Sequence, residues 1–219
     1  MQIQTAIFDM DGTLVDSLMM WDVKFAEFGR RFGDGTPFTP NEADSKAIRT
    51  LPTRMALELL HDHYGLGEST EELLDIANEI YRRFYGQEVQ LKPGVREFLE
   101  HCRQNGVRMC IATATARNLV EMALEHLGIG GYFERMFSCA ELGVGKDVPD
   151  VFLAAQEFLG APIADTWVFE DSLTALETAA KAGFPTVGIY DRFTPQQEDI
   201  AAVSTVYIAS GETMMKLVH

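Results

Sequence analysis

Residues 3–12 read IQTAIFDMDG, an apolar run that ends abruptly in two aspartates and a glycine. The run from Ile3 to Phe8 is rich in residues that favour strands, and the Asp-x-Asp-Gly that follows is typical of a turn. We therefore expect a buried strand with Asp9 and Asp11 directly after its carboxyl end. Alternate residues of an extended segment point in different directions, so these two carboxylates can serve different roles.

Four later apolar runs have the same character, and helical patterns lie between them. They are residues 107–112, 167–169, 186–190 and 206–209. Apolar residues at i, i+3, i+4 and i+7 predict helices within residues 95–102 and 120–127, and a third helix is expected at 174–182. Strand and helix alternate from about residue 90 onward, which predicts the α/β class, with a parallel sheet and helices on both faces.

Residues 16–88 behave differently, because they contain helical patterns and no convincing strand. Ser69 and Glu72 have the spacing of a capping box at the start of one of these helices. We therefore expect a helical insertion after the first strand of an α/β core. The predicted core is residues 1–15 and 89–219, and the predicted insertion is residues 16–88.

The charge of the chain excludes several classes of partner. Its 219 residues include 18 Lys and Arg against 33 Asp and Glu, a formal net charge of −15. Nucleic acids and anionic membranes are bound through cationic patches, and no basic run here is longer than a pair. We expect neither partner, and a small anionic ligand would need a local device to hold it.

The cysteines and the first residues bear on the compartment. The chain has three cysteines, Cys102, Cys110 and Cys139, and we interpret them as buried free thiols rather than metal or redox groups. The first residues lack the pattern of a secretory signal, and no apolar run approaches the roughly 18 residues of a membrane span. These features favour a cytoplasmic protein.

Polar residues follow the predicted strands at the points where they end. The first strand is followed by Asp9 and Asp11, the second by Thr113 and Thr115, and the third by Glu170 and Asp171. Lys146 lies in the glycine-rich loop 143–146, just before a helix that Pro149 could begin. Ligands of open parallel sheets bind outside the carboxyl ends of the strands, so we expect these groups to meet on one edge.

This combination indicates phosphoryl-transfer chemistry. Aspartate is a known nucleophile toward phosphoryl groups and forms an aspartyl-phosphate. Crowded carboxylates need a cation, and hard oxygen ligands beside a phosphate site indicate Mg²⁺. A threonine hydroxyl, backbone N–H groups and a lysine would hold the remaining phosphate oxygens.

Each element also has an ordinary structural explanation when taken alone. An isolated Asp-x-Asp-Gly is usually a solvated turn, Lys146 could be a surface lysine, and residues 170–172 could merely begin a helix. A calcium-binding EF-hand is excluded, because Gly12 stands at loop position four and Met20 at position twelve. The occurrence of all the elements, in this order and at strand ends, favours the chemical interpretation.

These stretches resemble the motifs of the haloacid dehalogenase (HAD) superfamily. The matching segments are 8–17 (FDMDGTLVDS) for the first motif, 111–115 (IATAT) for the second, Lys146 with 148–150 (VPD) for the third, and 169–172 (FEDS) with 179–183 (AAKAG) for the fourth. Residues 91–95 (LKPGV) resemble the family's return from cap to core. The likeness is greatest to the β-phosphoglucomutase and phosphoglycolate phosphatase group.

The resemblance implies a Rossmann-like core with an inserted α-helical cap. It implies that Asp9 is the nucleophile and Asp11 the general acid and base. It further implies Mg²⁺ held by Asp9, the backbone carbonyl of Asp11 and Asp171, with Glu170 close by or bound through water. The groups implied to bind the phosphate are Thr113, Ala114 and Lys146.

Cap residues are expected to choose the substrate. Arg54 is one candidate, because its neighbourhood resembles a cap segment where relatives place a substrate-binding arginine; a solvated helix charge is the alternative. Asn118 follows the second motif and could touch the substrate or lie on the surface of a helix start. Trp21 could form a wall of the pocket, and packing inside the cap is its alternative.

An acid at the position of Asp11 points to phosphate esters, because relatives that cleave carbon–halogen bonds lack one there. We therefore expect a monomeric Mg²⁺-dependent phosphatase that acts on a small phosphorylated metabolite. A sugar-phosphate phosphomutase is the alternative, disfavoured because Trp21 replaces a histidine that the mutases use. A non-catalytic phosphometabolite sensor is a further alternative, and the intact pair of Asp9 and Asp11 argues against it.

Overall fold

The structure, a computed structural model, describes residues 3–48, 51 and 53–218. The chain separates into two units. The core unit comprises Met1–Leu18 and Tyr85–His219, and the helical unit comprises Met19–Phe84. Each unit is described by itself below.

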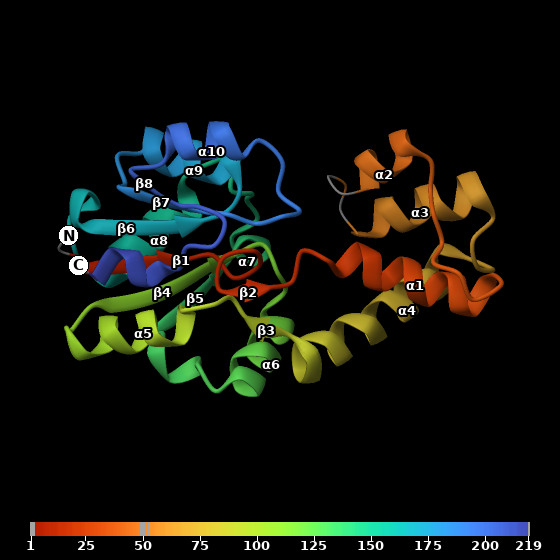
Figure 1. Ribbon diagram of the computed structural model, residues 1–219, viewed down its shortest axis with the longest axis horizontal. Helices are drawn as coiled ribbons and strands as arrows, with labels where there is room; N and C mark the ends of the chain where they lie inside the picture. The colour runs from red at the N-terminus through yellow and green to blue at the C-terminus, as the bar shows by residue number, and fades with distance from the viewer. Residues whose placement is uncertain (1–2, 49–50, 52, 219) are drawn as a thin grey trace. The chain divides into compact units, whose positions relative to one another are not determined.

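The core unit is built on a six-stranded sheet whose neighbouring strands all run parallel (Figure 1). Its strands are β1 (Thr5–Phe8), β4 (Arg108–Thr113), β5 (Arg135–Ser138), β6 (Thr166–Glu170), β7 (Thr186–Ile189) and β8 (Val206–Ile208). They lie in the order β5-β4-β1-β6-β7-β8. The most apolar run of the N-terminus thus forms an inner strand, buried on both faces as a parallel sheet requires.

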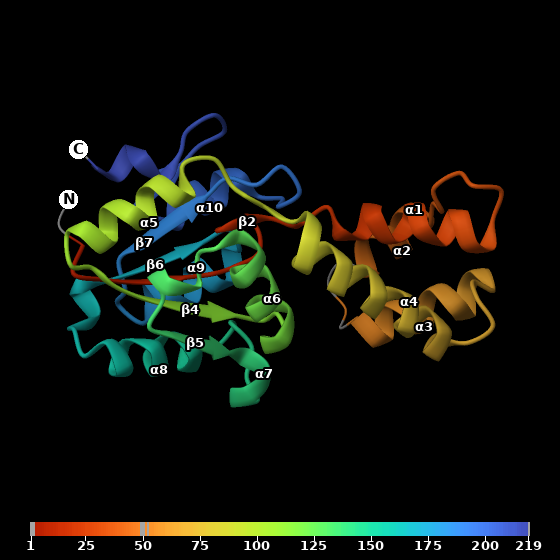
Figure 2. The same cartoon turned by 90° about the horizontal axis from the view of Figure 1, so that it is seen from below.

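Helices cover both faces of this sheet. They are α5 (Val95–Gln104), α6 (Arg117–Leu127), α7 (Cys139–Leu142), α8 (Asp150–Leu159), α9 (Leu173–Lys181) and α10 (Gln197–Val203), with short 3₁₀ turns η2 (Gly130–Tyr132), η3 (Ile163–Asp165) and η4 (Met214–Val218). Figure 2 shows α5 and α8 on opposite sides of the sheet. The predicted α/β class with helices on both faces is confirmed.

Successive residues of β1 show how each face is packed. Ile7 belongs to a buried cluster formed with side chains of α8 and α9. Phe8 points to the other face, where its ring lies 6.3 Å from Phe98 of α5 and 4.4 Å from Phe169 of β6. Fully burying side chains of this size stabilises a fold by roughly 1.5–3 kcal/mol each. The core beneath the carboxyl edge of the sheet is therefore firmly packed.

One strand of the sheet, β5, was missed by the sequence prediction. Only Met136 and Phe137 of its four residues are apolar, and Arg135 is exposed. The strand lies at the edge of the sheet and pairs with β4 alone. An edge strand needs no long apolar run, because one of its sides lacks a neighbouring strand.

A second, two-stranded sheet joins the segments on either side of the helical unit. Strand β2 (Val15–Asp16) pairs antiparallel with β3 (Gln90–Leu91). The prediction of no strand from residue 16 to 88 is therefore wrong at Asp16. Two residues are too short a stretch for a hydrophobic period to be recognised.

The helical unit contains α1 (Met20–Phe32), α2 (Glu42–Ile48), α3 (Thr53–Tyr64) and α4 (Thr70–Arg83), and a π-helical turn, η1 (Phe84–Glu88), follows it. The Ser69 hydroxyl accepts a hydrogen bond from the Glu72 N–H, so Ser69 is the predicted N-cap of α4. The Glu72 carboxylate instead accepts the N–H of Glu68. Only half of the predicted capping box therefore forms.

The three cysteines are free and buried, as predicted. Burial raises the pKa of the Cys102 thiol, and of the Cys110 thiol, to about 12, so both stay protonated and poorly reactive at neutral pH.

None of the helices in the described part of the chain combines the length and the apolar character needed to cross a bilayer.

Candidate active site

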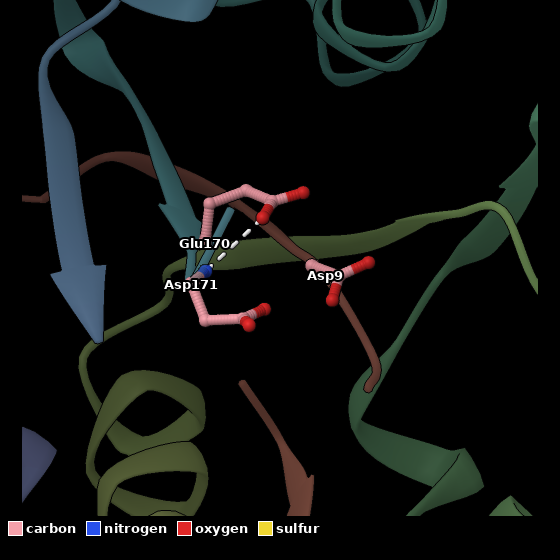
Figure 3. Close-up of side chains that lie close together, drawn as sticks. All are labelled: Asp9, Glu170 and Asp171. Atoms are coloured by element: carbon pink, nitrogen blue, oxygen red, sulfur yellow. Dashed lines mark hydrogen bonds between the residues drawn. The ribbon is translucent and has the colours of Figure 1, made fainter. Parts of the chain in front are cut away.

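Three carboxylates meet at the carboxyl ends of β1 and β6. These strands are neighbours, with Phe8 opposite Phe169, so Asp9 emerges beside Glu170 and Asp171. One carboxylate oxygen of each residue lies within 4.8 Å of the others, and all three side chains are buried. Figure 3 shows the carboxyl groups of Glu170 and Asp171 both directed toward the side on which Asp9 lies. The topology thus brings together the ends of two motifs that are far apart in sequence.

The electrostatics of this three-carboxylate cluster are unfavourable without added positive charge. Burial raises the pKa of Asp9 well above its ordinary value; Lys146 opposes this effect, and the neighbouring acids add to it. Burial, followed by the charge of Glu170, raises the pKa of Asp171 to about 7. Removing carboxylates from water and crowding them both disfavour their charged forms. A cation bound between them would offset both effects.

Lys146 reaches the cluster from the loop between α7 and α8. Its ammonium contacts Asp9 and donates a hydrogen bond to Glu170 Oε1 at 2.6 Å. Burial lowers the pKa of Lys146, but the charges of Asp9 and Glu170 outweigh it, so the net pKa is raised and the side chain is charged at neutral pH. One ammonium group does not balance three carboxylates.

Further bonds fix the two acids that follow β6. Glu170 Oε2 accepts the backbone N–H groups of Asp171 and Ser172, each at 3.0 Å. Asp171 Oδ2 accepts a hydrogen bond from the Thr194 hydroxyl at 2.8 Å. Thr194 lies in the loop after β7, and the sequence prediction did not include it. Its position beyond the carboxyl end of a strand was the available signal.

Asp11 lies outside the three-carboxylate cluster and is held by hydroxyl groups. Its Oδ1 accepts bonds from Ser17 and Tyr85, and its Oδ2 accepts one from Thr115, all at 2.6 Å. Asp9 and Asp11 therefore have different surroundings, as the alternation of an extended segment predicts. Tyr85 was not predicted to belong to the site.

The predicted phosphate loop follows β4. Thr113 is the last residue of that strand, and its hydroxyl oxygen accepts the Thr115 N–H at 3.0 Å. Ala114 is exposed, and Asn118 is an exposed residue in the first turn of α6. Thr113 thus ends the strand next to β1, and Asn118 lies one turn beyond the loop.

The two remaining predicted residues belong to the helical unit. Arg54 of α3 is largely exposed and pairs with Glu71 at 2.5 Å. The Trp21 ring, on α1, carries the ammonium of Lys24 over its face, 3.5 Å from its centroid, and lies against Phe25. Contact of Arg54 and Trp21 with a substrate stays a prediction.

Lys92 connects two loops of the core unit and was also missed. Its ammonium donates to the carbonyl of Gly12 at 2.6 Å, to the carbonyl of Tyr190 at 2.8 Å and to Asp191 Oδ2 at 2.8 Å. Three acceptors match the three donors of an ammonium group. Lys92 therefore ties the turn after β1 to the end of β7. In the sequence, Lys92 was recognised only as part of residues 91–95, the segment that resembles the family's return from cap to core.

Substituting Lys92 by methionine is expected to lower the free energy of unfolding by about 2 kcal/mol or more. The change leaves the carboxylate of Asp191, which is 3% exposed, without its cation, and breaking such a buried pair costs roughly 3–5 kcal/mol. Urea denaturation measures the loss. The matched control is Lys181→Met, which removes an exposed pair with Glu177 and should cost about 0.5 kcal/mol or less. Equal losses in both variants would contradict the role of Lys92.

Comparison with known proteins agrees with this geometry. A family model described as a haloacid dehalogenase-like hydrolase matches residues 3–183. The "Phosphorylated carbohydrates phosphatase" of Thermotoga maritima is 28% identical over 181 residues, which cover 83% of this chain and 82% of that protein. The "Probable pseudouridine-5'-phosphatase" of Drosophila melanogaster is 31% identical over 199 residues, 87% of this chain and 83% of the relative.

A solved structure gives the same result for the fold. The crystal structure of a candidate β-phosphoglucomutase from Thermotoga maritima superposes with a TM-score of 0.81 at 26% identity, covering 94% of each chain. The family match spans the strand ends that carry the three-carboxylate cluster and Lys146. The chain belongs to the haloacid dehalogenase-like hydrolase family.

Proposed function

We propose that this protein is a Mg²⁺-dependent phosphatase that hydrolyses the monoester of a small phosphorylated metabolite through an aspartyl-phosphate on Asp9. The observation that carries the proposal is the buried cluster of Asp9, Glu170 and Asp171, with Lys146 bonded into it. A nucleophilic carboxylate, a cation site and a fixed ammonium are the groups that phosphoryl transfer needs. Relatives named as phosphatases support the same reaction class.

The residues present fit a magnesium ion. Three buried carboxylates within 4.8 Å offer hard oxygen donors, the ligands that Mg²⁺ prefers. Asp9, Asp171 and the backbone carbonyl of Asp11 would hold the ion, with Glu170 close by or linked through water. When bound, it would supply the positive charge that the carboxylates lack and that a transferring phosphoryl group requires.

The reaction divides into two steps at the phosphorus. In the first, a carboxylate oxygen of Asp9 forms a bond to phosphorus while the bond to the ester oxygen breaks, and Asp11 gives that oxygen a proton. In the second, Asp11 takes a proton from water as the water oxygen attacks the same phosphorus. Inorganic phosphate leaves, and the carboxylate of Asp9 is restored.

Other groups of the core unit would hold the phosphate during both steps. The Thr113 hydroxyl, the Ala114 N–H and the Lys146 ammonium are the proposed donors to its oxygens. Lys146 already bonds to two carboxylates, so it needs only a small displacement to reach an anion beside Asp9. This arrangement holds an anion locally in a chain whose formal net charge is −15.

Substrate choice is assigned to residues outside this centre. We propose that the helical unit, Met19–Phe84, acts as a cap and that Arg54 and Trp21 contact the substrate, with Asn118 of the core unit. The two relatives are named for phosphorylated carbohydrates and for pseudouridine 5'-phosphate, which favours a phosphorylated sugar or nucleoside here. The prediction of a monomer in the cytoplasm is retained.

A panel of phosphate esters tests the proposal. It contains sugar phosphates, nucleoside monophosphates and phosphoglycolate, each incubated with Mg²⁺ and, in parallel, with excess EDTA. We expect at least one ester to release inorganic phosphate, and EDTA to lower the rate by about a hundredfold or more, reversibly on adding Mg²⁺.

Two results would overturn the proposal. One is no release of phosphate from any ester; the other is full activity in EDTA. A sugar phosphate that is isomerised without stoichiometric inorganic phosphate would replace hydrolysis by phosphomutase activity.

A further inference from the structure

The side chain of Asp11 is bonded to three hydroxyl groups that come from three separate segments. Ser17 follows β2, Tyr85 begins the return to the core unit, and Thr115 follows β4. Each donates at 2.6 Å, within the range of the strong hydrogen bonds that hydroxyl groups make to a carboxylate. The two oxygens of Asp11 differ, because Oδ1 receives two of these bonds and Oδ2 receives one.

The two donors to Oδ1 come from the segments directly before and after the helical unit. Ser17 is next to the last residue of the first segment of the core unit, and Tyr85 is the first residue of the second. The pairing of Val15 with Leu91 holds these segments together. The Ser17 and Tyr85 hydroxyls therefore both reach Oδ1 of Asp11 from segments that this strand pairing holds together.

The third donor connects Asp11 with the proposed phosphate loop. Thr115 stands two residues after Thr113, and its own backbone N–H donates to the Thr113 hydroxyl. A carboxylate held at Oδ1 therefore keeps Oδ2 directed at the loop in which the ester is proposed to bind. Proton transfer requires the acid within hydrogen-bond reach of the reacting oxygen, so this orientation matters for the chemistry.

We propose that Tyr85 is a positioning residue that fixes Oδ1 of Asp11 and so aims Oδ2 at the reacting ester oxygen and, later, at the attacking water. Tyr85 suits this task because the residue is 4% exposed and its hydroxyl stands at the end of a rigid ring with two rotatable bonds. With Ser17 as the remaining donor to Oδ1, Asp11 would have more freedom to rotate about its bond from Thr115. This inference rests on the proposed phosphatase activity.

The test compares Tyr85→Phe with wild type on two esters. One is an alkyl phosphate, whose leaving oxygen needs a proton; the other is p-nitrophenyl phosphate, whose leaving group needs none. With the alkyl ester we expect kcat to fall about tenfold with KM changed less than about twofold, because a transition-state interaction is lost. With p-nitrophenyl phosphate we expect a rapid burst of nitrophenolate followed by a slowed steady rate, because only the water step needs Asp11.

The matched control is Tyr132→Phe, which removes another tyrosine hydroxyl bonded to a carboxylate of the core unit, at Glu100. It should leave both esters unaffected. Thermal unfolding of each variant separates loss of fold from loss of orientation, and Ser17→Ala, combined with Tyr85→Phe, should deepen the loss of kcat.

The outcomes separate the two proposals. An active wild type with unchanged kcat and no added burst in Tyr85→Phe overturns the role of Tyr85 alone. A loss on both esters that follows only the fall in melting temperature also overturns it. A wild type that releases phosphate from no ester overturns the phosphatase itself, and this role with it.

Discussion

Asp9→Asn is expected to abolish phosphate release, with kcat/KM lowered by about 10⁴-fold or more on the best ester of the panel. The amide has the shape of the carboxylate and can still contact Lys146, but it cannot form the bond to phosphorus. Steady-state release of inorganic phosphate measures the loss. Rapid acid quenching followed by mass spectrometry should detect covalent phosphate on the wild type and none on the variant.

A second aspartate provides the matched control for this substitution. Asp199→Asn makes the same chemical change at an exposed position in the first turn of α10 and should leave activity unchanged. Asp9→Asn itself should stay folded, because it removes a buried charge while Lys146 retains Glu170 as a partner. An Asp9→Asn protein with more than about a tenth of wild-type activity would contradict a nucleophilic role.

The sequence predicted the inner strands because each carries its own apolar signal. The residues of β1, β4, β6 and β7 are almost all buried, and the apolar runs that marked these strands lie within about two residues of the observed bounds. Strand β5 has no such run, because its alternation places an exposed arginine next to two apolar residues. Its existence follows from its pairing with β4, which one segment of sequence does not reveal.

The same distinction holds within the candidate site. Residues at a strand end or directly after it, such as Thr113, Glu170 and Asp9, could be predicted to converge because parallel strands share one carboxyl edge. Tyr85 and Lys92 could not, since neither follows a predicted strand, and their polar ends meet the site only through the fold. Lys92 lies in the return to the core, where the sequence pattern identified a connection and no function, and Tyr85 lies in the stretch that was predicted to belong to the insertion.

The turn that follows Asp9 and Asp11 has a specific steric requirement at Gly12. Gly12 has a φ of +79°, and a Cβ atom there would lie 2.6 Å from both Cγ and Oδ2 of Asp171. Asp171 is 5% exposed and accepts a hydrogen bond from Thr194, so it is not free to move aside. The glycine therefore serves both the backbone conformation and the close approach of the two motifs.

Gly12→Ala is accordingly expected to lower the free energy of unfolding by about 3 kcal/mol. Roughly 1–2 kcal/mol is the cost of a left-handed conformation for an L-residue, and displacing the buried, bonded carboxylate of Asp171 adds about 1–3 kcal/mol. Because Asp171 is a proposed metal ligand, kcat/KM should also fall by about a hundredfold, and half-maximal activity should require more Mg²⁺. Urea denaturation and a Mg²⁺ titration of activity measure the two effects.

Gly211→Ala is the control that separates the effect of the contact with Asp171 from the effect of backbone strain. Gly211 has a φ of +82°, and nothing lies within 4 Å of a Cβ atom placed on it. The same substitution there should cost only the conformational part, about 1–2 kcal/mol, and leave activity and its Mg²⁺ dependence unchanged. If Gly12→Ala were no more destabilising than Gly211→Ala and kept full activity, the approach of Asp171 to the turn would not matter. A greater loss in the free energy of unfolding for Gly12→Ala, with a raised Mg²⁺ requirement, would show that Gly12 matters for the position of Asp171 and not only for the turn.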